Sequence, residues 1–253
     1  MKTRFLYHAD AVAATGHVTL PFSETMEIQA AVALPINGGH GSSRVERFRH
    51  RDIFSFERAE SHVVGSFSEK DNAHGTLASV IVEGLNILNV VTCERIIVRI
   101  TSKHPEDGEP SIIPLGSRFQ GLKIAGHRIE VDLATDLFTQ LSTWTGLSDA
   151  YAKDKKIRAQ IDSLALYPKE SGGFERKRGT FGCTLARNLD HLPGGLTRKD
   201  HGIYVPHFGT VYLGEFFISA GARRLLMLNV ELGCSVEGGY GVGSGSGNGD
   251  IWP

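Results

Sequence analysis

Alternation of apolar and polar residues with a period of two runs through most of this chain and constrains its fold more than any other feature. In MEIQAAVALPI the alternation places six residues on one face of an expected strand: Met26, Ile28, Ala30, Val32, Leu34 and Ile36. Further segments of this kind are SHVVGSFSE, TLASVIVEGLNIL and ERIIVRI, separated by loops rich in glycine, proline and charged residues. The chain therefore predicts a mainly β fold, an antiparallel sandwich or barrel built from hairpins.

Two segments share the pattern Gly-Leu-x-Ile, followed by a turn and an alternating stretch. They are GLNILNVVTCERIIVRI at 84–100 and GLKIAGHRIEVDL at 121–133. Glycine permits a bend, and apolar residues two positions apart point into the same core. The repeat predicts two related hairpins, whereas a solenoid would need roughly three copies or more.

The period changes between Ala134 and Leu166, where β signals are almost absent. Apolar residues at helical spacing predict one helix over about 149–164 with Ser148 as its N-cap, and a shorter helix near 135–144. We therefore expect a helical insertion near 135–165. Later in the chain, TVYLGEFFIS and RRLLMLNVELG predict a β-hairpin.

These elements predict a single β-rich domain over residues 1–240. Residues 241–253 form a Gly/Ser-rich C-terminal tail, which by composition is flexible or loop-like. Trp252 lies near its end, and the sequence leaves open whether this side chain docks as an anchor or is exposed.

Composition and charge narrow the classes of partner. The formal net charge is −1, so no global field favours nucleic acid, and we expect no nucleic-acid partner. No stretch approaches the roughly 18 apolar residues of a membrane span. The three cysteines form no CxxC pair, which argues against a zinc or redox motif. The N-terminal apolar run is too short for a signal peptide, which by itself predicts a cytoplasmic location.

Motifs for catalysis and cofactor binding are absent from the sequence. There is no Gly-x-Ser-x-Gly elbow, GxGxxG loop, Walker A motif or EF-hand. The eleven histidines form no known ligand spacing, and positions in loops account for them more simply. We assign no catalytic residue, no metal ligand and no cofactor, and we expect a non-enzymatic protein. A pocket holding a histidine–carboxylate pair beside a serine would revive a hydrolase.

Two basic clusters remain. RVERFRHR places Arg47, Arg49 and Arg51 on one strand face, and FERKRG at 174–179 gathers basic residues in a loop. A charged edge strand that resists aggregation is the simpler interpretation of the first cluster. The alternative is an electrostatic contact with a neighbouring subunit or an anionic polymer, and of these we favour self-association. Arg47, Arg49, Arg51 and Trp252 are our candidates for contacts in a homo-oligomer.

Three segments follow one another in a characteristic order. They are GTLASVIVEGLNILNVVTCERIIVRITS, GSRFQGLKIAGHRIEVDL and FGTVYLGEFFISAGARRLLMLNVELG with the Gly/Ser-rich end, within 61–133 and 208–249. In this layout the chain resembles the choice-of-anchor P family, Gly-rich bacterial β-proteins that are mostly exported. The resemblance implies a structural role and a location at the cell surface or outside the cell. The family usually carries a signal peptide, which this chain does not show, and the stretch 134–166 is not a family feature.

These observations favour a non-enzymatic structural protein that self-assembles or forms part of a surface or extracellular assembly. Two alternatives stay open. A carbohydrate- or small-ligand-binding β-module would need exposed aromatic residues on one face, and the chain has only two tryptophans and six tyrosines. A hydrolase would build its site from loop histidines and carboxylates.

Overall fold

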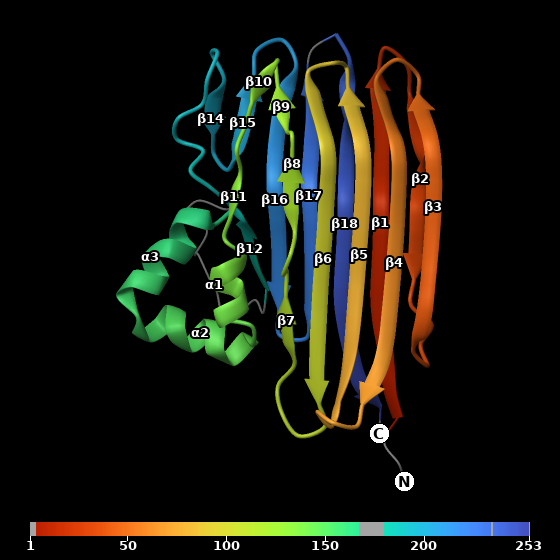
Figure 1. The fold of residues 1–253 in the computed structure, drawn as a ribbon. Coiled ribbons are helices and arrows are strands. Elements are labelled where there is room, and N and C mark those ends of the chain that lie inside the picture. Colours follow the sequence, from red (N-terminus) through yellow and green to blue (C-terminus); the bar gives the residue numbers. More distant parts are fainter. Residues whose placement is uncertain (1–3, 167–179, 234, 253) are drawn as a thin grey trace.

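The computed structural model describes residues 4–166, 180–233 and 235–252. Two antiparallel sheets lie face to face, and three helices lie beside them, on the side away from β2 and β3 (Figure 1). The predicted mainly β fold with a helical insertion is confirmed, in the form of a sandwich.

Sheet A has the hydrogen-bonded order β14-β15-β16-β17-β18-β1-β2, and β12 also pairs with β16. Both ends of the described chain contribute to it, because β1 pairs with β18 along nearly its whole length. Its strands are β1 (Arg4–Leu20), β2 (Glu24–Ala33), β12 (Thr180–Thr184), β14 (Thr197–Lys199), β15 (Gly202–Val205), β16 (Gly209–Ser219), β17 (Ala222–Gly233) and β18 (Glu237–Trp252).

Sheet B has the order β10-β9-β6-β5-β4-β3, and β7 and β8 also pair with β6. Its strands are β3 (Gly39–His50), β4 (Phe54–Ser68), β5 (Ala73–Ile87), β6 (Val91–Pro105), β7 (Ser111–Ile113), β8 (Arg118–Gln120), β9 (Lys123–Ile124) and β10 (His127–Arg128). A separate short pair joins β11 (Asp132–Leu133) to β13 (Ala186–Arg187).

The helical insertion consists of α1 (Thr135–Gln140), α2 (Trp144–Lys153) and α3 (Lys155–Leu164). The prediction of one helix over 149–164 is wrong, because Asp154 interrupts it: its side chain accepts hydrogen bonds from the first backbone amides of α3. Ser148 is not an N-cap either. It is buried inside α2, where Thr143 caps the N-terminus by accepting from the Gly146 amide.

One row of residues crosses sheet B and changes which side chains face the core. In every second strand the residue in this row has a positive φ: 52° at Arg47, 66° at Gly84 and 64° at Gly121. Glu57 and Glu94 occupy the row in the strands between them. A positive φ in an otherwise extended strand bends the chain and re-aims the side chains that follow.

The consequence is visible in β5, where the buried residues change from even to odd numbers across Gly84. Val80 and Val82 face the core before it, and Leu85 and Ile87 face the core after it. The pairing register is kept because neighbouring strands shift together. Sheet A has an equivalent row of alternating positive φ, which consists of Ala30, Ala13, Gly243, Met227 and Gly214.

The Gly-Leu-x-Ile repeat belongs to the row in sheet B. Its glycines, Gly84 and Gly121, supply the positive φ, and the following Leu and Ile residues are buried in the core. Each copy then ends in a turn with two central residues of positive φ, at 88–89 and 125–126, as in a type I′ hairpin. The prediction of two related hairpins is confirmed by β5–β6 and β9–β10.

The face predicted for residues 26–36 is partly wrong. Ala14 pairs with Gln29 and Gly16 with Met26, so β2 holds one extra residue between these pairs. This β-bulge turns Ile28 outward, where it is 58 % exposed, while Met26 stays buried.

The prediction of a flexible or loop-like tail at 241–253 is also wrong. Residues 241–252 continue β18, which lies between β1 and β17 in sheet A (Figure 1). Gly245 and Gly247 face sheet B, and a Cβ at Gly247 would come within 3.2 Å of the Ile100 side chain. Glycine in a strand permits close approach of a second layer, so this composition builds a narrow part of the core.

Aromatic contacts join the two layers. The Phe54 ring in β4 stacks on Tyr240 in β18 with centroids 4.9 Å apart. In the helical insertion, Phe138 of α1 makes an edge contact with Phe216 of β16. No helix in the described part of the chain combines the length and apolar character needed to cross a membrane.

Candidate functional site

The two sheets end together along one side of the sandwich, which we call the open margin and define as strands β2 and β3 (Figure 1). Within the described residues, β2 pairs only with β1, and β3 pairs only with β4. The two strands contact each other, since a Cβ at Gly41 would come within 2.7 Å of the Val32 side chain. An edge strand presents unpaired N–H and C=O groups that can pair with another chain.

Charges alternate across the outer face of sheet B and end at this margin. One residue from each strand forms what we call the charge ladder: Glu46, Arg58, Glu83 and Arg95. The Arg95 Nε lies 2.9 Å from Glu83 Oε1, so the inner end of the ladder is an ion pair. Opposite charges directly across neighbouring strands stabilise a sheet.

A second row reinforces the ladder at the margin. The Arg44 Nε lies 3.5 Å from Glu60 Oε1, and Arg44 also pairs with Glu46 on its own strand. The hydrogen bond from Arg58 holds the pKa of the Glu60 carboxyl below its ordinary value. The same bond, with the nearby carboxylates, raises the pKa of the Arg58 guanidinium. Both shifts favour the charged forms of Arg58 and Glu60, so this pair is ionised at neutral pH.

The three arginines predicted for self-association lie at or just beyond the end of β3 and are exposed. Arg47 occupies the positive-φ row. Arg49 forms an ion pair with Asp52 at 2.5 Å. Arg51 follows β3 and donates to Glu24 Oε2 at 2.6 Å, with its guanidinium over the ring of Phe22. Two of the three are thus engaged within the chain.

The other predicted residues are not placed by the structure. Trp252 ends β18, and its side chain lies outside the described part of the structure. The basic loop segment 174–179 also lies outside the described residues.

A buried histidine joins the open margin to the core. His50 is 7 % exposed; its Nδ1 lies 2.9 Å from Tyr240 Oη and its Nε2 lies 3.1 Å from Glu24 Oε1. Hydrogen bonds from Arg51 and His50, the Arg51 bond being the stronger influence, lower the pKa of the Glu24 carboxyl. Burial raises the pKa of Tyr240 to about 12. These contacts link β2, β3 and β18.

Other histidines lie in separate places. His201 Nε2 lies 3.4 Å from Glu215 Oε1, and its ring lies over Tyr212. His104 Nε2 lies 3.0 Å from Ser102 Oγ inside the sandwich. Among the described residues, no group of three or more His, Cys, Asp or Glu side chains is placed to hold a metal ion.

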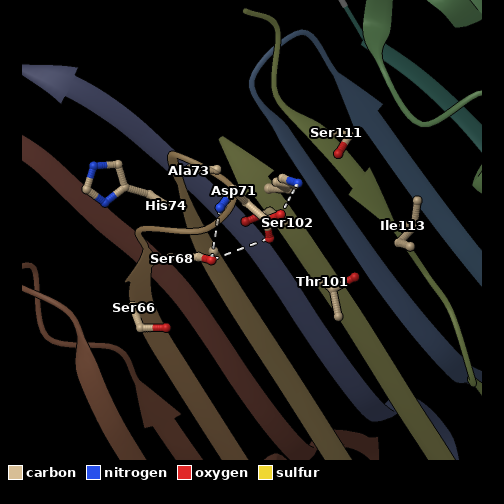
Figure 2. Close-up of a pocket in the computed structure, with 11 residues that line it drawn as sticks. Ser66, Ser68, Asp71, Ala73, His74, Thr101, Ser102, Ser111 and Ile113 are labelled. Carbon is tan, nitrogen blue, oxygen red and sulfur yellow. Dashed lines mark hydrogen bonds and ion pairs between the residues drawn. The ribbon is translucent and has the colours of Figure 1, made fainter. Parts of the chain in front are cut away.

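A pocket of about 390 Å³ opens on sheet B where β4, β5, β6 and β7 run side by side (Figure 2). Small residues in one row create the hollow, since Ser66, Gly75 and Ser111 flank Lys103 across the strands. A Cβ at Gly75 would meet only backbone oxygens, the nearest at 3.6 Å, so the space above it is open.

Hydroxyl groups and one ion pair line this pocket. The hydroxyl-bearing residues of the lining are Ser66, Ser68, Thr101, Ser102 and Ser111. Lys103 Nζ lies 3.5 Å from Asp71 Oδ1. Such a lining donates and accepts hydrogen bonds without strong net charge, which suits a small neutral polar ligand.

His74 lines the pocket, but its imidazole ring makes its contacts with Tyr7 and Phe5 in the protein interior. Its Nδ1 lies 2.7 Å from Tyr7 Oη, and its ring stacks on Phe5 at 4.1 Å. Figure 2 shows this ring directed away from Thr101 and Ile113. Burial lowers the pKa of His74, which favours the neutral form at pH 7. The pocket therefore gives the hydrolase hypothesis no support.

A family described as a domain of unknown function, DUF8256, matches residues 5–171, about two thirds of the chain. The chain belongs to the DUF8256 family. The matched segment contains all of sheet B, the helical insertion, and β1 and β2 of sheet A. The open margin and the charge ladder lie within it. No curated protein and no solved structure matches the chain.

Sequence reasoning singled out the arginines at the end of β3 but missed the ladder. The alternation of charge in the ladder cannot be read along any one strand. Arg58, Glu83 and Arg95 are far apart in sequence and become neighbours only through the pairing register. The pocket was missed for the same reason, because its hydroxyls come from several strands.

Proposed function

We propose that this DUF8256 protein is a non-enzymatic structural protein that self-associates through its open margin. Support from the sequence comes from the absence of catalytic motifs and from the resemblance to the choice-of-anchor P family, which itself stays a prediction. Assembly at a surface or outside the cell is the setting that this resemblance favours.

The observation that carries the proposal is the apolar exposure along β2. Leu20 ends β1 just before the strand and is 51 % exposed, Ile28 lies in its middle, and Ile36 follows it and is 60 % exposed. Large apolar side chains exposed along an unpaired edge are a costly arrangement for an isolated protein. Covering them with a second copy would bury apolar area and satisfy edge backbone groups.

The test is the oligomeric state of the purified, untagged protein. Sedimentation velocity and light scattering over a concentration series should show reversible dimers or larger species, and negative-stain electron microscopy should show their form. Substituting Ile28→Ser should weaken association, while Leu115→Ser, at an exposed position away from the margin, should not. A monomer at every concentration would overturn the proposal.

A second candidate function is binding of a small neutral polar ligand such as a sugar. The hydroxyl-lined pocket favours it, although the described lining supplies no phenylalanine, tyrosine or tryptophan on which a sugar ring would stack. Titration with neutral monosaccharides, followed by backbone amide shifts, should perturb residues of β4, β5 and β6 around Gly75. Gly75→Val should fill the hollow and abolish the shifts, while Gly75→Ala should weaken them less. Uniformly unperturbed spectra would exclude these ligands.

A further inference from the structure

The sequence Arg44-Val45-Glu46 at the centre of β3 is complementary to itself in an antiparallel pair. Arg44 and Glu46 lie on the outer face of the strand, each about half exposed. If two copies of β3 run antiparallel with Val45 opposite Val45, each Arg44 lies opposite the Glu46 of the other copy. A two-fold axis through this point therefore creates two cross-strand pairs of opposite charge from one short segment.

We propose that two copies of the chain pair β3 to β3 in this register, with the two-fold axis at Val45. The inference rests on the proposed self-association and names its geometry. It joins the two B sheets into one continuous sheet, with backbone hydrogen bonds supplying attraction and side chains fixing the register.

The charge ladder is the main argument for this register. Across sheet B the charges alternate from Arg95 through Glu83 and Arg58 to Glu46, where β3 ends the sheet. Arg44 of the second copy, placed opposite Glu46, adds the next positive charge and continues the alternation across the axis. The row from Glu60 to Arg44 is continued in the same way by Glu46 of the second copy.

Neighbouring registers are disfavoured by the same charges. Side chains keep to the same face of a joined sheet only when the pairing shifts by two residues at a time. A shift in one direction places Arg44 opposite Arg44, and a shift in the other places Glu46 opposite Glu46. Like charges directly opposite destabilise a strand pair, so the chosen register is separated from both neighbours.

The second layer is compatible with this pairing. β2 lies behind β3 at the open margin, so the same axis brings the two β2 strands toward each other. Ile28 is exposed on β2 and gains an apolar environment there. Arg47, the predicted contact residue that lacks a described ion pair, falls opposite Ser43 of the second copy, where no like charge faces it.

The test uses two single charge reversals, Arg44→Glu and Glu46→Arg, in the full chain. Each variant alone places like charges opposite one another at both symmetric positions, and its dimer should weaken about tenfold or more. Mixing the two variants should restore association, because in the mixed dimer every carboxylate at positions 44 and 46 of one chain faces a guanidinium of the other. Each reversal also disturbs contacts within its own chain, but these disturbances are the same before and after mixing.

The readouts separate failure of this inference from failure of the proposed function. A wild-type protein that stays monomeric overturns self-association itself. A wild-type dimer whose variants associate unchanged, or whose mixture is no tighter than either variant, overturns the register and leaves self-association standing.

A measurement without substitutions guards against misfolded variants. Hydrogen exchange of the wild-type protein at dimeric and at dilute monomeric concentrations should show slower exchange in residues 39–50 of the dimer, since these edge amides gain partners. Protection confined to another edge would also overturn the register.

Discussion

Gly84 of β5 lies directly opposite Glu57 of β4, and the Glu57 side chain occupies the space that a Cβ at Gly84 would need. The same relationship recurs between Gly121 and Glu94. In both pairs, the aliphatic part of a glutamate side chain packs against a glycine of positive φ in the same row of sheet B. The glycine of the Gly-Leu-x-Ile repeat is therefore required twice, by conformation and by space.

We expect Gly84→Ala to destabilise the protein by roughly 2 kcal/mol, because positive φ is costly for an L-residue and the added methyl group displaces Glu57. Chemical denaturation followed by circular dichroism measures the free energy of unfolding. Gly126→Ala is the matched control: its φ is also positive, at 81°, but no heavy atom lies within 4 Å of the added Cβ. The control should lose only about 1 kcal/mol. Equal losses for the two variants would contradict the steric part of the argument.

The sequence was sufficient for the fold class and for most strands, because few structures other than a half-buried strand produce alternation over ten or more residues. It was insufficient where a strand changes face. Ile28 was assigned to the same face as Met26, because a β-bulge leaves no local signature in the sequence. The change of buried face at Gly84 becomes visible only when the neighbouring strands, which change face in the same row, are known. These features are properties of pairing, which a single stretch of sequence does not contain.

The C-terminal segment shows a different limit. Its composition matches a flexible linker, yet Gly245 and Gly247 fill the interior side of a central strand. A high glycine content is found both in flexible linkers and in strands that pack closely against a second sheet, so composition alone does not distinguish the two. The candidate site is limited in the same way, since only its arginines form a local pattern, and two of these bind partners in their own chain.

Gly247→Val tests the close approach of the two sheets. The added side chain would meet Ile100 and overpack the core, so we expect a loss of roughly 1–3 kcal/mol in the free energy of unfolding. Gly241→Val is the control on the same strand, because its added atoms face Thr15 and Leu226, neither of which is buried, and it should change stability by less than about 1 kcal/mol. If residues 241–253 were a flexible tail, both variants would unfold at the wild-type denaturant concentration.

The buried Tyr240 hydroxyl should make the protein lose stability in alkali. Burial raises the pKa of Tyr240 in the folded protein to about 12, above its ordinary value of 10.0. Since the folded state holds this proton more tightly, the contribution is complete below pH 10 and is lost as the pH rises toward 12. Tyr240→Phe removes the titrating group and also the hydrogen bond to His50, and should be less stable at pH 8 by roughly 1–3 kcal/mol.

The measurable quantity is the stability difference between wild type and Tyr240→Phe as a function of pH. It should shrink between pH 10 and 12. Comparing the two proteins cancels other groups that titrate there, including Tyr212, whose pKa is also raised to about 12, and Arg223, whose lowered pKa acts in the opposite direction. A difference that is constant across this range would contradict the assignment.

Arg223 of sheet A holds both β7 of sheet B and the end of α1 in the helical insertion. It is 3 % exposed in β17, and its guanidinium donates to the backbone oxygens of Ile112, at 2.6 Å, and Leu141, at 3.2 Å. Arg223→Met keeps the apolar stem but leaves both oxygens without this donor, which should cost roughly 1–3 kcal/mol. The loss should be local: hydrogen exchange should accelerate in 111–141 more than in β4 and β5, because both acceptor oxygens lie in that segment, one in β7 and one at the end of α1. Arg224→Met, next in sequence but exposed and bonded only to Ser244 Oγ among its described contacts, should leave exchange in 111–141 unchanged. Uniform acceleration throughout the protein in Arg223→Met would instead mean that the insertion and the sandwich unfold as one cooperative unit.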